Sequence, residues 1–121
     1  MIFNQDIVDL AKKNTNFRQV LVTGKNSQLV LMSISPKGEI GKEVHNNVDQ
    51  ILCFIEGEGE AVLDDEVSSV IPGFVTFVPA GTWHNFYNTG ETDLKLYTIY
   101  APPQHKDGTI HKTKEDAEQA E

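Results

Sequence analysis

One histidine stands in a stretch whose turn and strand signals predict its orientation. Residues 73–88 read GFVTFVPAGTWHNFYN, in which 76–78 is a short β-rich run and Pro79-Ala80-Gly81 is a turn signal. A second β-rich run, 83–87, follows the turn, so the two runs predict a hairpin that presents His84 on the face opposite Trp83. Imidazole binds metal ions and transfers protons. A lone histidine in a strand is more often structural, so chemistry at His84 requires partners elsewhere in the chain.

Candidate partners lie upstream, in residues 38–59, GEIGKEVHNNVDQILCFIEGEG. Glu43 and His45 are two residues apart, so in an extended chain both side chains project from one face. Gln50 stands at the head of an apolar run, 51–55, that ends in alternating glycine and glutamate. These three polar residues are the candidates to join His84.

The downstream stretch resembles the second sequence motif of the cupin superfamily, G-x5-P-x-G-x2-H-x3-N. Every fixed position of that motif is matched, by Gly73, Pro79, Gly81, His84 and Asn88. A complete match with this spacing is a specific signal.

The upstream stretch resembles the first cupin motif, G-x5-H-x-H-x3,4-E-x6-G, with departures. Glu43 stands where the first histidine is usual, His45 fits the second, and Gln50 replaces the glutamate. Gly57 closes the motif at its usual spacing, whereas Gly38 opens it one residue short. The order and separation of the two motifs identify the chain as similar to small single-domain cupins of the cupin-2 type. That resemblance implies an all-β fold, a jelly-roll barrel also described as a double-stranded β-helix.

The resemblance also implies a metal site made of Glu43, His45, Gln50 and His84. Two imidazole nitrogens and two side-chain oxygens suit one divalent ion, with zinc, iron, manganese, nickel and copper all compatible. The set is similar in kind to that of cupin-type mannose-6-phosphate isomerases, which also mix Glu, Gln and two His. An alternative register uses Asn47 with His45 and Gln50, and a second alternative is a polar cavity without metal. We prefer Glu43 to Asn47, because Asn46-Asn47 is typical of a turn and amides are poor ligands.

Two classes of function follow from this site. The first is a metal-dependent enzyme, oxygenase-like or sugar isomerase- or epimerase-like, that acts on a small polar molecule. In that class Glu43 is a candidate base if it is not a ligand, and an inward-facing tyrosine is a candidate acid. The second is a non-catalytic module that binds a sugar or another small molecule. We favour the enzyme, because four protein ligands leave coordination positions open to substrate.

The rest of the chain divides into three segments. Residues 1–16 predict a short helix over 4–13, with Asn4 as its cap, and residues 17–101 predict the β-barrel. The barrel begins with a hairpin of runs 17–23 and 28–34, an edge through which we expect a homodimer to form. A monomeric mass in light scattering would contradict the dimer.

Residues 102–121 form a polar C-terminal extension that holds two of the four histidines, His105 and His111. A tail folded over the barrel would bring a histidine to the pocket. We favour surface positions for both, because exposure is usual for polar residues.

Amino-acid composition limits the classes of partner that the protein is expected to bind. The 121 residues carry a formal net charge of −8, which disfavours nucleic acid and anionic membranes as partners. No apolar run approaches the ~20 residues of a membrane span, and the N-terminus lacks the pattern of a signal peptide. The single cysteine, Cys53, is expected to be a small buried apolar residue, and a cytoplasmic location is expected.

Overall fold

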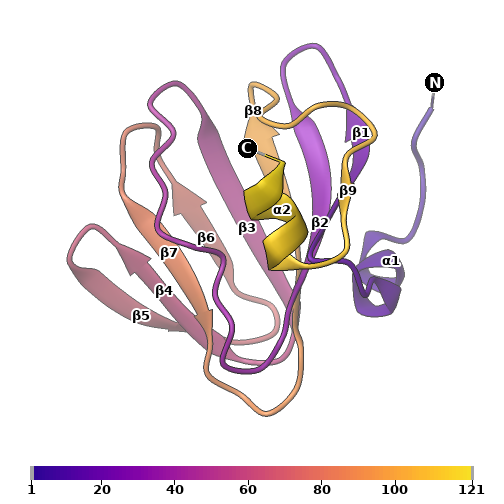
Figure 1. The fold of residues 1–121 in the computed structure, drawn as a ribbon. Coiled ribbons are helices and arrows are strands. Elements are labelled where there is room, and N and C mark those ends of the chain that lie inside the picture. The colour runs from indigo at the N-terminus through magenta and orange to yellow at the C-terminus, as the bar shows by residue number, and fades with distance from the viewer. Residues whose placement is uncertain (1, 121) are drawn as a thin grey trace.

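The computed structural model describes residues 2–120 and is dominated by β-strands (Figure 1). In chain order the elements are α1 (Ile7–Lys13), β1 (Arg18–Thr23), β2 (Gln28–Ile34), β3 (Asp49–Glu56), β4 (Gly59–Leu63), β5 (Glu66–Val70), β6 (Val75–Val78), β7 (His84–Asn88), β8 (Leu94–Ala101), β9 (Ile110–His111) and α2 (Lys114–Gln119). None of the helices within residues 2–120 has the length and apolar character needed to cross a membrane. The all-β prediction is confirmed.

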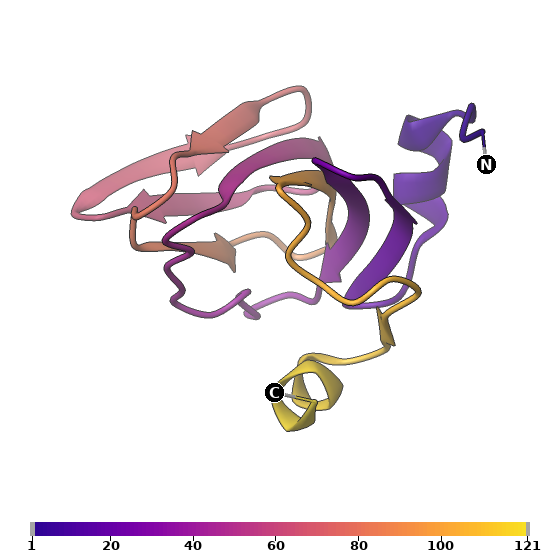
Figure 2. The same cartoon turned by 90° about the horizontal axis from the view of Figure 1, so that it is seen from above.

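Two antiparallel sheets form the walls of the barrel. Six strands pair in the order β6-β3-β8-β2-β1-β9, and three pair in the order β5-β4-β7 (Figures 1 and 2). Alternate residues of both sheets point inward, and the rings of Phe54 on β3 and Phe86 on β7 meet with centroids 5.8 Å apart. The largest fully buried apolar and aromatic side chains are Tyr100, Phe54, Phe86, Met32, Ile34, Leu52, Leu94 and Leu96. Burial of this apolar surface is the main force that holds the two walls together.

The N-terminal predictions hold with one correction. β1 and β2 form the expected hairpin, with Arg18 opposite Met32. The helix begins later than expected, because the side chain of Asp6, rather than that of Asn4, caps it by accepting a hydrogen bond from the Asp9 amide. The first two residues of β1 pair with β9, so this strand is not a free edge at that end. The homodimer stays a prediction.

The prediction of a hairpin within residues 73–88 is wrong. β6 pairs with β3 in the larger sheet, whereas β7 pairs with β4 in the smaller one. The turn at Pro79-Ala80-Gly81 therefore carries the chain from one wall to the other. Its amides are held across that gap, since the Ala80 amide donates to Asp49 Oδ1 and the Gly81 amide donates to the His45 carbonyl.

The segment before β3 pairs with β7, the edge strand of the smaller sheet. The Ile40 amide donates to the Phe86 carbonyl at 3.0 Å, and the backbones of Glu43 and His84 exchange two hydrogen bonds of 2.9 Å. Glu43 and His84 are therefore directly opposite partners, and the side chains of such partners lie on the same face. This pairing is what brings the two sequence motifs together.

Gly57, which closes the first motif, permits a close approach of backbone. Its φ is +85°, and a Cβ at this position would lie 2.5 Å from the Asp93 carbonyl oxygen and 3.0 Å from Leu94 Cα. We expect Gly57→Ala to lower the free energy of unfolding by at least ~3 kcal/mol, because a left-handed conformation and a backbone clash add together. Chemical denaturation measures this loss.

Gly108 provides the matched control for that substitution. Its φ is +77°, but at this exposed turn a Cβ would have no atom of the described residues within 4 Å, apart from those of its chain neighbours. We expect Gly108→Ala to lose only about 1 kcal/mol, from the backbone conformation alone. Equal losses at the two positions would show that the clash with residues 93–94 has no energetic consequence.

Candidate metal centre

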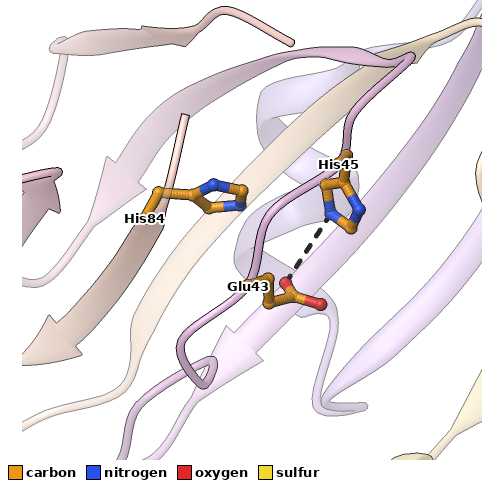
Figure 3. Close-up of side chains that lie close together, drawn as sticks. All are labelled: Glu43, His45 and His84. Carbon is orange, nitrogen blue, oxygen red and sulfur yellow. Dashed lines mark ion pairs between the residues drawn. The ribbon is translucent and has the colours of Figure 1, made fainter. Parts of the chain in front are cut away.

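Glu43, His45 and His84 form a compact cluster inside the barrel. One ligand atom from each residue lies within 4.8 Å of the others. Figure 3 shows His84 reaching in from one wall, while Glu43 and His45 reach in from the segment paired with it. Glu43 Oε1 lies 3.9 Å from His45 Nε2. The structure thus brings together three of the four residues that the sequence proposed as ligands.

The orientation of His84 follows from its place at the start of β7. Its side chain is 3% exposed, whereas that of the preceding residue, Trp83, is 49% exposed, as the strand alternation predicts. His84 Nδ1 lies 2.9 Å from the carbonyl oxygen of Thr82. A carbonyl only accepts, so Nδ1 carries the proton and the lone pair of the neutral ring is on Nε2. Nε2 is buried and has no hydrogen-bond partner among residues 2–120.

His45 presents a second lone pair to the same space. Its Nε2 is also buried without a hydrogen-bond partner in the described part of the chain, and the two imidazole centroids are 5.4 Å apart. Burial lowers the pKa of His45, and the neighbouring His84 and Arg18 lower it further. This shift favours the neutral ring, the form in which imidazole binds a metal ion.

Gln50, the fourth residue proposed as a ligand, lies on β3 and is 2% exposed. Its Nε2 donates to Thr98 Oγ1 at 3.1 Å, while its Oε1 is buried and accepts no hydrogen bond from residues 2–120. Its antiparallel partner in the sheet is Tyr100, whose ring lies 6.1 Å from that of His45. An unpaired buried amide oxygen is costly, and a cation near Oε1 would remove that cost.

The donor set fits a single divalent ion. The Glu43 carboxylate clusters with His45 and His84, whose Nε2 atoms are buried without hydrogen-bond partners among the described residues. Gln50 Oε1 is likewise buried and unpartnered there. Nitrogen and oxygen donors of this kind suit borderline divalent metals. Asn47, the alternative ligand, is exposed in the turn that follows His45, and this excludes it from the site.

The sequence analysis did not predict that Tyr100 and His105 contact each other near this centre. Tyr100 is 1% exposed, and the ring of His105 packs edge-on against it with centroids 5.0 Å apart. Burial raises the pKa of Tyr100 far above its ordinary value, so its phenol remains a proton donor. The expectation that His105 is a surface residue is wrong, because its ring packs against the buried Tyr100 and its Nε2 is buried. His111 is likewise only partly exposed.

Arg18 is the other residue that the sequence analysis missed. It is 5% exposed and lies on the inward face of β1, with its guanidinium carbon 5.3 Å from the centroid of the Phe17 ring. The sequence signal that could have revealed Arg18 is a charged residue that shares one face of the expected strand 17–23 with Val20. Cys53, by contrast, is half-buried rather than fully buried.

The neutral His105 makes the stability of the metal-free protein depend on pH. Burial, followed by Arg18, lowers the pKa of His105 from 6.5 to about 3. Between these pH values the unfolded chain binds a proton at this residue and the folded chain does not, so stability falls as the pH falls. We expect the melting temperature to drop between pH 7 and pH 4, and to drop less in His105→Gln. Parallel pH profiles for the two proteins would contradict this origin.

Comparison with known proteins agrees with this architecture. The family described as "Cupin domain" matches residues 30–100. A crystal structure of BH2720 from Bacillus halodurans has a TM-score of 0.95 and 44% identity, covering 97% of this chain and 93% of that one. The uncharacterized protein YrkC of Bacillus subtilis (strain 168) is 48% identical over 116 residues, which cover 91% of this chain. The aligned region spans 62% of the length of YrkC.

One similar protein carries the name of an enzyme. A 5-nitrosalicylic acid 1,2-dioxygenase from Bradyrhizobium sp is 33% identical over 67 residues. The match covers 55% of this chain and 32% of that enzyme. The similarity is therefore confined to part of each chain.

Proposed function

Since the chain belongs to the cupin family, we propose that it holds one divalent metal ion and is a metal-dependent enzyme that acts on a small polar molecule. Glu43, His45 and His84 are the proposed ligands, and the Gln50 amide oxygen is the fourth. The observation that carries the proposal is the Glu43, His45 and His84 cluster, in which both Nε2 atoms are buried and unpartnered within residues 2–120. Buried polar atoms without partners are rare in folded proteins, and several in one place favour a ligand that satisfies them.

The residues around the proposed ion have different roles. Glu43 supplies the only carboxylate of the cluster found among residues 2–120, so the protein contributes one negative charge toward a divalent cation. The Thr82 carbonyl fixes the tautomer and ring orientation of His84, the role that second-layer partners have in metal sites. When bound, the metal would polarise a carbonyl or hydroxyl oxygen of the substrate in an open coordination position.

Tyr100 is a proton donor next to this centre. Its buried phenol stays protonated and its ring contacts that of His45, so it is placed to donate to a substrate bound beside the ligands.

Two reaction classes agree with this arrangement. An oxygenase-like reaction is supported by the partial similarity to the dioxygenase. An isomerase-like reaction is supported by the mixed Glu, Gln and two-His ligand set.

The metal content of the purified protein tests this proposal. The full chain is purified without added metal or chelator, and its metal content is measured by inductively coupled plasma mass spectrometry. We expect close to one transition-metal ion per chain, and less than a tenth of that in His45→Ala. Zinc directs the next assays to isomerisation, whereas iron, manganese or copper directs them to oxygen consumption. A protein that is metal-free and takes up no divalent ion on dialysis would overturn the proposal and leave the non-catalytic binding module.

A further inference from the structure

A cavity of about 280 Å³ is lined by Arg18 and His105 and by none of the proposed metal ligands. Its walls come from β1, from the segment 104–109, from His111 on β9, and from Ala117 of α2 with Ala120, the C-cap of that helix. The lining includes Arg18 and Lys106, and within residues 2–120 it includes no aspartate or glutamate. In a chain of net charge −8, this local excess of positive charge is a distinct feature.

Arg18 carries a charge in this place with no ion-pair partner in the described part of the chain. Its Nη1 donates to His111 Nδ1 at 3.3 Å. Its Nε is buried and has no hydrogen-bond partner among residues 2–120. A buried guanidinium is costly unless an anion accompanies it, so this geometry favours an anion that residues 2–120 do not supply.

His105 stands beside Arg18 and is held in place by its backbone. The Gln28 side chain is almost fully buried, donates to the His105 carbonyl at 2.7 Å and accepts from the His105 amide at 2.9 Å. The backbone of His105 is thereby fixed. The ring Nε2 is buried without a partner among the described residues. A neutral imidazole can place one N–H toward an anion held by the guanidinium.

We infer that this cavity is a binding site for a small oxyanion, a carboxylate or phosphate group, held by the Arg18 guanidinium with His105 as second donor and Lys106 at its rim. Arginine offers five N–H donors that match the planar or tetrahedral oxygens of such groups. The site goes beyond the proposed function and does not depend on it. Tyr100 separates the two, since its ring contacts both His105 and His45.

Nuclear magnetic resonance titration of the chelator-treated full chain tests this inference. Sodium phosphate and sodium malonate are added in separate experiments, each matched to sodium chloride at equal ionic strength. We expect saturable shifts of the Arg18 Nε–H signal and of the His105 ring signals, absent with chloride. The oxyanion with the lower dissociation constant identifies which of the two groups the cavity prefers.

Variants separate a built site from general charge attraction. We expect Arg18→Lys, which keeps the charge but loses the planar fork of donors, to bind at least about tenfold more weakly. His105→Leu should weaken binding less, and Lys25→Gln, at an exposed turn outside the cavity, should leave it unchanged. Unchanged affinity in Arg18→Lys, an equal loss in Lys25→Gln, or no saturable shift in the wild type would overturn the inference.

Two further comparisons keep the test decisive. If Arg18→Lys does not fold, the wild-type titration and His105→Leu decide the outcome. His84→Ala distinguishes the two sites, because it should lose metal and retain the oxyanion. If oxyanion binding disappears in His84→Ala while the variant remains folded, the cavity is not an independent site and the inference fails, whatever the metal content of the wild type.

Discussion

Replacing His84 with alanine is expected to abolish stoichiometric metal binding. His84 is the proposed ligand that enters through a strand of the smaller sheet, and its Nε2 is fixed toward the cluster by the hydrogen bond of Nδ1 with Thr82. Loss of an outer partner of a metal ligand typically costs 10- to 100-fold in affinity, and loss of the ligand itself should exceed this. Competition with a fluorescent chelator measures the dissociation constant.

His111→Ala is the matched control for this prediction. His111 is also a partly buried histidine, but it lies on β9 and contacts Arg18 rather than the ligand cluster. We expect it to retain close to one ion per chain. If His111→Ala loses metal as severely as His84→Ala, the ion is bound elsewhere and the ligand assignment is wrong.

Substitutions at the two oxygen ligands are expected to change metal affinity in opposite directions: Glu43→Gln should lower it, and Gln50→Glu should restore it. Glu43→Gln leaves two imidazoles and two neutral amides, so we expect metal affinity to fall by roughly 100-fold. Adding Gln50→Glu to that variant restores the negative charge at a neighbouring position and should recover most of the affinity. Isothermal calorimetry with one chosen ion, zinc, compares the four combinations.

The stability of the metal-free protein provides an independent readout of the same exchange. Gln50 is 2% exposed, so a carboxylate in its place is buried without a compensating cation. We therefore expect Gln50→Glu to lower the melting temperature without metal. At a free zinc concentration 100 times the dissociation constant, binding adds about 2.7 kcal/mol to the free energy of unfolding.

The affinity comparison has its own contrary outcome. A double variant that binds zinc no better than Glu43→Gln would show that Gln50 is not a ligand.

The spacing of residues along the chain determined the parts of this protein that depend on local geometry. Strand alternation correctly predicted that His84 and Trp83 lie on opposite faces, since successive side chains of a strand alternate. The two motifs predicted the all-β barrel and three residues that do lie within 4.8 Å of one another. The N-terminal hairpin was likewise correct, because its turn and its flanking β-rich runs are adjacent in sequence.

Only the tertiary structure decided which distant segments share a wall and a cavity. The turn at 79–81 looked like a hairpin turn, yet the runs on either side of it pair with different strands, a choice set by the packing of two sheets. Arg18, Tyr100 and His105 come from three segments that meet because the chain turns back after Pro102. Their spacing carries no local signal of that meeting, since the pairing of β1 with β9 joins residues about 90 positions apart.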